Sequence, residues 1–455
     1  MLLVSLCLLV PALLHFAAEC RYFSEQRLYD LPLFTQAAIR HWQGEPVYAR
    51  AADLLNQYKP GAIVFKFPPP YLFLFLPWFD AGGEWLVHFQ GGFITVAAVL
   101  YAVMLLLACK LVWCASNNLA SNNLASNNGG VQAFPSGRNG FALFVLLVLV
   151  AACWFVPILH VLGATSVENF LICMAVIAFV SMQRWPWLAG CIFAYLAMIK
   201  LYPAFLLLYP LLTRQWRVVG AAAVSFVLIA MASIVIFGWE ENRFYVTQIL
   251  PILLSEPVSE DWTDMFMHAS GNLGIVKVLV TYGLLPSRSN ECLNAIRLPL
   301  VALMIVLVWF RAGKHESGWS SLLGYALVVV TMMVCLPNLF YPYLTVLLFP
   351  LVVLCGFLAY RRQWWWLLVL MLPLSSLWVN DTWTIAQVNA YQLLSPTDDV
   401  VARIEQAGAW TFLWQEHPML GLLMVQGRVV PFTPYIAWLA LALCLFFLRP
   451  ERLRE

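Results

Sequence analysis

The sequence predicts an all-α integral membrane protein, with one polytopic domain over residues 1–455. Three observations carry this prediction: the composition, the long apolar runs and the distribution of charge. Of 455 residues, 62% are hydrophobic and 11% are charged, whereas soluble domains are about 45–50% apolar and about 25% charged. This composition excludes an ordinary soluble enzyme and a disordered chain. The net charge of +2 also provides no field to attract a polyanion, so no nucleic-acid partner is expected.

The apolar runs supply the predicted helices, because a spanning helix needs roughly 20 apolar residues. Three shorter apolar pieces are interrupted by proline or charge, namely 68–79, 186–199 and 202–213. Broken helices are tolerated at membrane depth where they line a protein cavity, so we expect the functional site near them. We predict about 11–13 transmembrane or broken helices. The long runs are 1–18, 85–109, 139–159, 167–183, 218–238, 295–310, 318–336, 343–360, 363–379 and 433–449.

The charged residues predict the orientation. One set of turns holds twelve basic and three acidic residues, and the remaining segments hold 13 basic and 20 acidic residues. Because cytoplasmic loops are enriched in Lys and Arg, the first set is expected to be cytoplasmic. Residues 19–67, 239–294 and 380–432 then face outward. We expect a multi-pass protein of a bacterial inner or plasma membrane, with its site facing the periplasm or exterior. The first segment lacks a basic start and a cleavage signal, so an uncleaved helix is favoured over a secretory signal.

A cytoplasmic turn contains a short perfect repeat. Residues 116–128 read SNNLA, SNNLA, SNN and are followed by two glycines. Such polar, small residues cannot bury a core. We therefore predict a flexible insert over 114–138, and a partner-docking tag is the alternative interpretation.

The first outer segment contains the candidate catalytic acid. Residues 35–42 suit a short amphipathic helix in the membrane interface, and residues 51–58 suit a second one. Asp30 stands just before the first of these helices. A partly desolvated carboxylate beside a membrane-bound substrate suits a general base. The alternative is a helix-flanking or isolated surface acid.

Several segments share the order and residues of a known family. Around Asp30, and in stretches spread over roughly residues 20–350, the chain resembles glycosyltransferase family 87. This family lies within the C-type superfamily of polytopic, lipid-sugar-dependent glycosyltransferases, and its best-known members are mycobacterial mannosyltransferases that use polyprenol-phosphate-mannose. The sequence departs from the family pattern after Asn272 and at residues 338–341. The matching stretches are Tyr29-Asp30, Gly44–Tyr48, Phe67–Tyr71, Met198–Pro203, Arg214–Arg217, Gly238–Trp239 with Leu250–Pro251, Gly271–Gly274 and Leu336–Tyr343.

The resemblance implies an inverting transfer of a hexose, with mannose favoured, from a polyprenyl-phosphate sugar to an outward-facing glycolipid or glycan. Asp30 would act as the base, and Glu25 and Asp53 are the fallbacks. The leaving phosphate needs no acid assistance, so positioning and electrostatic stabilisation suffice. No cofactor or metal is expected, because the first outer segment offers one well-placed acid rather than a pair of oxygen ligands. The eleven cysteines contain no C-x-x-C pair, which also argues against a zinc site.

Further residues are candidates for substrate contacts. Lys200 ends a short apolar helix, and an intramembrane charge is a functional hypothesis by default; a snorkelling lysine is the alternative. We expect Lys200, His268 and Arg243 to bind the donor phosphate. Loop and interface-belt roles are the alternatives for His268 and for the tyrosines. The predicted substrate-binding residues are Asn272, Asn338, Tyr341, Tyr343 and Lys66.

Other functions remain open at this stage. A transporter or flippase of envelope glycolipids would also use broken helices, but the two halves show no hydropathy repeat and the outer segments are long. A non-catalytic subunit of an envelope complex is a further alternative. A lipid-linked glycan ligase or polymerase would rely on Arg and His in a late outer segment. Residues 380–432 supply only Arg403, Arg428 and His417.

Overall fold

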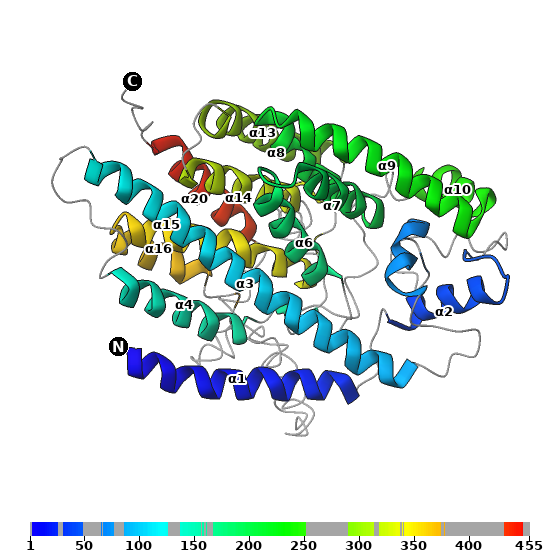
Figure 1. Ribbon diagram of the computed structural model, residues 1–455, viewed down its shortest axis with the longest axis horizontal. Helices are drawn as coiled ribbons and strands as arrows, with labels where there is room; N and C mark the ends of the chain where they lie inside the picture. The colour runs from blue at the N-terminus through cyan, green and yellow to red at the C-terminus, as the bar shows by residue number, and fades with distance from the viewer. Residues whose placement is uncertain are drawn as a thin grey trace, which may run out of the picture.

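The structure is a computed structural model, and it is all-α over the residues that it describes (Figure 1). The described residues are 2–25, 31–48, 65, 67–76, 86–125, 137–155, 157–158, 161, 167–251, 290–313, 318–336, 339, 341–374, 377 and 432–448.

Each of the ten long apolar runs contains a helix, so the predicted all-α class is confirmed. Most of these helices lie roughly along the long axis of the molecule, with α1 at one edge and α9 at the opposite edge (Figure 1). The helices are α1 (Leu2–Glu25), α3 (Leu86–Ala125), α4 (Gly137–Cys153), α6 (Glu168–Ser181), α9 (Trp216–Phe237), α13 (Asn290–Leu307), α14 (Gly318–Val334), α15 (Leu348–Tyr360), α16 (Trp364–Leu374) and α20 (Thr433–Phe447).

The core of the bundle is centred on α14. Nearly all of its residues are buried, as expected for a helix that is apolar on every side. It contacts α3, α13, α15 and α20. Tyr325 of α14 donates a hydrogen bond to the Ala175 carbonyl of α6 at 2.7 Å. This bond gives a buried hydroxyl its partner and fixes α6 against the centre.

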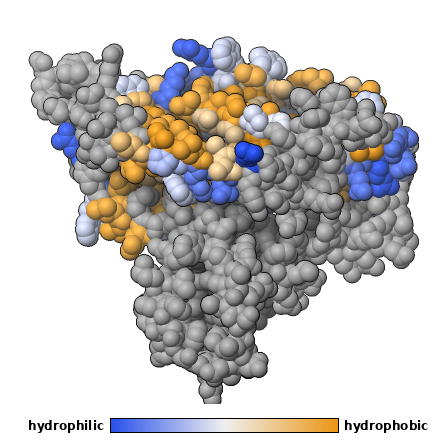
Figure 2. Space-filling view, turned by 90° about the horizontal axis from the view of Figure 1, so that it is seen from below, coloured by the Kyte–Doolittle hydropathy of each residue, from blue (hydrophilic) through white to orange (hydrophobic). Residues whose placement is uncertain are grey.

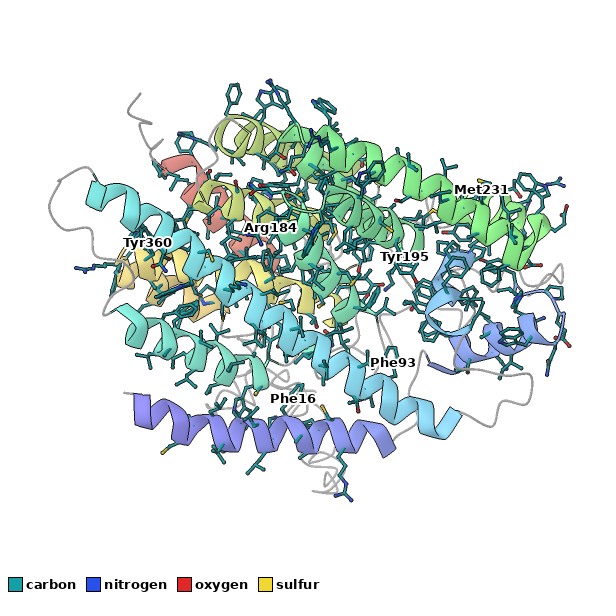
Figure 3. The ribbon with its side chains drawn as sticks, viewed as in Figure 1. Phe16, Phe93, Arg184, Tyr195, Met231 and Tyr360 are labelled. Carbon is teal, nitrogen blue, oxygen red and sulfur yellow. The ribbon has the colours of Figure 1, made fainter. Side chains whose placement is uncertain are left out.

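The outer surface of the bundle is strongly apolar. Four helical segments are long and apolar enough to cross a membrane, within α3, α9, residues 294–312 and residues 343–360, and several shorter apolar helices accompany them. Val235 of α9 is 82% exposed, and Met231 lies on the outer side of the same helix (Figure 3). Orange hydrophobic atoms cover much of the coloured surface in Figure 2. Such an apolar exterior suits contact with lipid, so the chain is a membrane protein.

The three interrupted pieces form short elements. Residues Pro69–Leu74 form the 3-10 helix η2, which at about 2.0 Å per residue is roughly 12 Å long and too short to span a bilayer. Helix α7 covers Pro186–Ile199. The 3-10 helix η4 (Tyr202–Leu207) continues directly into α8 (Leu208–Leu212).

Two copies of one supersecondary motif become visible in the structure. In each copy a Tyr-Pro pair opens a 3-10 helix, η4 with six residues and η7 (Tyr341–Leu347) with seven. Leu-aromatic-Pro-Leu then opens the α-helix, α8 or α15. An arginine at positive φ follows each of these two helices, Arg214 (59°) after α8 and Arg362 (56°) after α15. In both copies Gln-Trp comes next, and the following helix begins at the Trp. The chain therefore does contain an internal repeat, at the scale of a few helical turns, although its two halves show no repeat in hydropathy. The copies are too short and too uniformly apolar to appear in hydropathy.

The SNNLA insert differs from its prediction. Helix α3 continues to Ala125, so residues 116–125, which hold the first two copies, are helical. The physical reason is that Ala and Leu in each copy are good helix formers that extend an existing helix without a new nucleation step. Residues 126–136 lie outside the described residues.

Candidate functional site

The central feature of the site is a buried ion pair between two helix ends. Lys200 follows the last residue of α7, and Glu168 is the first residue of α6. The Lys200 Nζ donates to Glu168 Oε1. The Lys200 side chain is 7% exposed and that of Glu168 is 0% exposed. We call these two residues the central pair.

Local structure explains why the two charges are placed there. A helix N-terminus favours a negative group and a helix C-terminus favours a positive one. Glu168 lies in the first turn of α6, and Lys200 caps α7 in an extended conformation. Because α6 and α7 pack against each other, both favourable ends meet. The helix dipoles therefore offset part of the cost of burying the two charges.

Three aromatic rings surround the ammonium group. Lys200 Nζ lies 4.9 Å from the centre of the Tyr343 ring, 5.4 Å from that of Phe67 and 5.9 Å from that of Tyr202. Tyr202 and Tyr343 are themselves neighbours, with ring centres 5.9 Å apart. These tyrosines come from the two copies of the repeated motif, η4 and η7. Broken helices at corresponding positions of a repeat are a strong indicator of a binding site in membrane proteins.

Several polar atoms near the central pair are buried without a hydrogen-bond partner in the protein. Among the described residues there are seven such side-chain atoms, and five of them belong to four residues of α6, η4 and η7. The Tyr202 hydroxyl interacts electrostatically with Glu168, but it forms no hydrogen bond of normal geometry. Buried polar groups are normally satisfied, so this concentration indicates a place that receives a polar ligand. The four residues are Glu168 (Oε2), Asn169, Tyr202 and Thr345.

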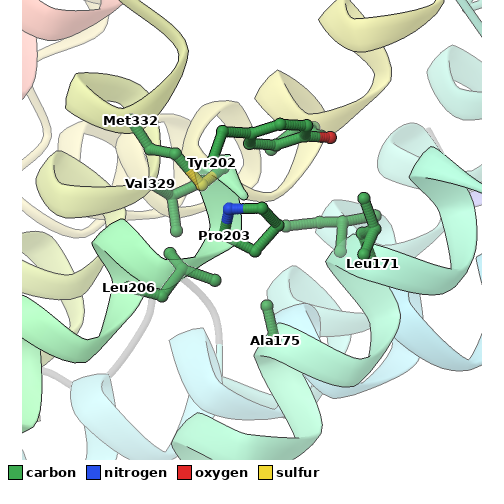
Figure 4. Close-up of a pocket in the computed structure, with 9 residues that line it drawn as sticks. Leu171, Ala175, Tyr202, Pro203, Leu206, Val329 and Met332 are labelled. Atoms are coloured by element: carbon green, nitrogen blue, oxygen red, sulfur yellow. The ribbon is translucent and has the colours of Figure 1, made fainter. Parts of the chain in front are cut away.

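A small apolar pocket shares Tyr202 with these polar groups (Figure 4). Its wall includes Tyr202 and Pro203 of η4, and Leu171, which lies one helical turn beyond Glu168 on α6. Val329 and Met332 of α14 close the opposite side (Figure 4). The pocket has space for about one water-sized group, and it adjoins the aromatic surroundings of Lys200 through Tyr202.

The described part of the predicted first outer segment packs close to this region. Helix α2 (Leu31–Trp42) begins at the residue after Asp30. Its buried Phe34 contacts the ring of Phe67 at 5.5 Å, and Phe67 also lies under Lys200. The first turn of α2 and the central pair therefore share one aromatic neighbour. The predicted interfacial helix at 35–42 is part of α2.

A second cluster lies at the far end of α2, and we call it the outer cluster. His41 packs on Phe237 with ring centres 4.9 Å apart. The buried Glu241 of α10 (Trp239–Phe244) accepts a hydrogen bond from the Tyr48 backbone N–H at 3.4 Å. Burial lowers the pKa of His41, and the nearby Glu241 opposes that shift. The imidazole is therefore held in its neutral form to a lower pH than usual.

The structure separates the predicted site residues. Tyr343 lies beside Lys200, whereas Arg243 does not accompany them. It lies on α10, where its guanidinium faces Glu240 at 3.8 Å and both side chains are more than 60% exposed. Of Tyr341 only the backbone is described, at the start of η7. The residues outside the described part of the chain are Asp30, Lys66, His268, Asn272 and Asn338.

Sequence reasoning missed Glu168. The signal was present, because Glu168 is the lone charged residue in the apolar run 167–183, and an intramembrane acid is a functional hypothesis by default. Over the described residues, no group of three His, Cys, Asp or Glu side chains could hold a metal ion.

Comparison with known families agrees with this geometry. The model of glycosyltransferase family 87 matches residues 65–337, which is more than half of the chain. The matched part includes α6, α7, η4 and α14, and therefore the central pair and most of the pocket lining. A search of curated proteins found no match. The chain therefore belongs to glycosyltransferase family 87 and is a membrane-bound glycosyltransferase.

Proposed function

We propose that the protein transfers a hexose, with mannose favoured, from a polyprenyl-phosphate sugar to an outward-facing glycolipid or glycan. The transfer inverts the anomeric carbon, and Asp30 is the general base. The single observation that carries the proposal is the central pair beside an apolar pocket. A cation that adjoins an apolar pocket through a shared residue, Tyr202, suits a lipid whose head is a phosphate.

The proposed reaction needs two contributions from the protein. Asp30 takes the proton of the acceptor hydroxyl while its oxygen forms a bond to the anomeric carbon. The bond between that carbon and the phosphate oxygen breaks, and the polyprenyl phosphate leaves with one additional negative charge. A fixed cation stabilises the charge that develops on the leaving oxygen. Lys200 is placed to supply it.

The contact between Phe34 and Phe67 supports the role of Asp30. Asp30 immediately precedes the helix that carries Phe34, and Phe67 lies under the Lys200 ammonium. A base must reach the acceptor while the phosphate is held a few ångströms away. Helix α2 approaches the central pair through this contact of Phe34 with Phe67.

The test is a transfer assay with purified full-length protein in lipid or detergent. Labelled polyprenyl-phosphate-mannose and membrane glycolipid extract are supplied to the wild type and to Asp30→Asn. We expect Asp30→Asn to lose at least about 100-fold in rate, the usual contribution of a general base. Glu19→Gln is the matched control, because it changes another acid of the same segment, one that is 30% exposed and has no proposed role in the reaction. Full activity of Asp30→Asn would refute the base assignment. Movement of lipid across the membrane without a new glycosidic bond would contradict the transfer itself.

A further inference from the structure

We infer that Glu168 is a built-in substitute for the donor phosphate. Its carboxylate neutralises Lys200 while the site holds no lipid phosphate, and an incoming lipid phosphate takes its place on Nζ. Glu168 is thus a positioning residue that sets how tightly Lys200 binds the donor and the product. This inference rests on the proposed function and adds a residue and a competition to it.

The first argument is the cost of burying Lys200. An ammonium group with 7% of its side chain exposed needs a partner anion, because an isolated buried charge is strongly unfavourable. Glu168 supplies that anion, and the three surrounding rings add cation–π attraction. A phosphate can replace the carboxylate because it offers the same charge and more acceptor oxygens.

The second argument is that the pair is poorly satisfied for a purely structural ion pair. Structural buried pairs are stable when further hydrogen bonds satisfy their remaining polar atoms. Among the described residues, Glu168 Oε2 has no partner of normal hydrogen-bond geometry, and the Tyr202 hydroxyl interacts with this carboxylate only as a weak donor. Released from Nζ, the carboxylate can turn toward Tyr202 and make this weak interaction a normal hydrogen bond. The Glu168 carboxylate therefore has two possible hydrogen-bond partners, Lys200 when no phosphate is bound and Tyr202 when a phosphate occupies Nζ.

The third argument is the position of the apolar pocket. It shares Tyr202 with the aromatic surroundings of Lys200, and Leu171 and Ile172 place it about one turn along α6 from Glu168. A phosphate on Lys200 would therefore have its first lipid carbons beside the pocket. Tyr202 borders both the ammonium and the pocket, so it could contact both parts of one amphiphile. A free phosphate would leave the pocket unused.

The experiment measures binding rather than transfer. Purified full-length protein is titrated with farnesyl phosphate, a short polyprenyl phosphate, and farnesol serves as the uncharged control. We expect Glu168→Gln to bind farnesyl phosphate about tenfold tighter than the wild type, because the competing carboxylate is gone. We expect Lys200→Gln to bind it about tenfold weaker, the scale of one charge-assisted hydrogen bond. Farnesol affinity should be the same in all three proteins.

A purely structural role for Glu168 makes a different prediction. It would lower the unfolding temperature in both variants and leave the affinity for farnesyl phosphate unchanged. Equal or weaker binding by folded Glu168→Gln would therefore overturn the inference. Inorganic phosphate binding as tightly as farnesyl phosphate would also overturn it, because the pocket would then contribute nothing.

Further variants keep the inference testable if Glu168→Gln does not fold. Glu168→Asp keeps the charge but withdraws it by one methylene, so tighter binding in the same direction is expected. The neutral double variant Glu168→Gln/Lys200→Gln avoids an unpaired charge, and it should bind farnesyl phosphate about tenfold more weakly than the wild type. Wild-type affinity in the double variant would exclude Lys200 as the anchor.

Binding as expected without hexose transfer would refute the proposed function alone, and transfer without the expected change in binding would refute this inference alone.

Discussion

Two cation–carboxylate pairs in this protein carry the same charges in very different surroundings. Lys200 and Glu168 are almost fully buried between α6 and α7, whereas Arg243 and Glu240 lie on the surface of α10, with 61% and 67% of their side chains exposed. Attraction between charges is weakened by water and strengthened in a buried site. The comparison teaches that the buried pair, Lys200 with Glu168, is the candidate for binding a phosphate, because its charges are not screened by water.

The largest expected effect comes from breaking the buried pair. Lys200→Leu alone should lower the free energy of unfolding by about 3–5 kcal/mol, because it leaves a buried carboxylate without a partner. The double variant Lys200→Leu/Glu168→Leu should recover most of that loss, since neither charge remains. Thermal unfolding of the purified protein measures both values. Equal destabilisation by the single and double variants would show that packing, and not charge, decides stability there.

The helix that carries Lys200 is held by a close backbone contact. An added Cβ at Gly190 of α7 would lie 2.6 Å from the Ala221 Cβ and 2.6 Å from the Ala222 backbone N of α9. Gly190→Ala should therefore destabilise the protein by about 1–3 kcal/mol through overpacking. It should also reduce transfer, because α7 positions Lys200.

Gly220→Ala is the matched control for that change. Gly220 lies on α9, and an added Cβ there would meet no neighbouring atom within 4 Å, so alanine should be neutral or stabilise by up to about 1 kcal/mol. Unfolding midpoints of the two variants are compared directly. Equal stability of Gly190→Ala and the wild type would contradict the close packing of α7 on α9.

The outer cluster should respond to pH. Burial lowers the pKa of His41 below its usual value near 6.5. The unfolded chain therefore binds a proton more readily than the folded protein, and the contribution of His41 is fully present above about pH 6.5. It is lost as the pH falls toward the lowered pKa. Unfolding midpoints at about pH 7.5 and about pH 5.5 test this expectation. His41→Gln should reduce the difference between them, and an unchanged difference would exclude His41 as its source.

The smallest effect is expected at the exposed pair. Arg243→Ala should change the free energy of unfolding by less than about 1 kcal/mol, because exposed ion pairs contribute little. It should leave farnesyl phosphate affinity close to that of the wild type. Binding reduced as strongly as in Lys200→Gln would restore Arg243 as a phosphate ligand and remove the distinction between the two pairs.

The positions of the helices could be predicted from the sequence because long apolar runs admit few structures in a membrane. All ten predicted runs contain helices, and Lys200 was a candidate because a lysine at the end of an apolar helix is conspicuous. The extent of α3 was misjudged at residues 116–125, where local composition suggested an irregular segment. These residues extend α3, which has already nucleated, so they need no new nucleation step. A short stretch of sequence does not show that a helix precedes it.

Composition, hydropathy and residue order by themselves determined the membrane class, the approximate helix boundaries and the family resemblance. Each of these depends on local properties or on the order of motifs along the chain. Only the tertiary structure decided that Glu168 is the partner of Lys200, that Tyr202 and Tyr343 meet around the ammonium, and that Arg243 lies elsewhere. The reason is that these contacts join residues far apart in the sequence, and helix packing alone determines which side chains meet and which charges lose their water.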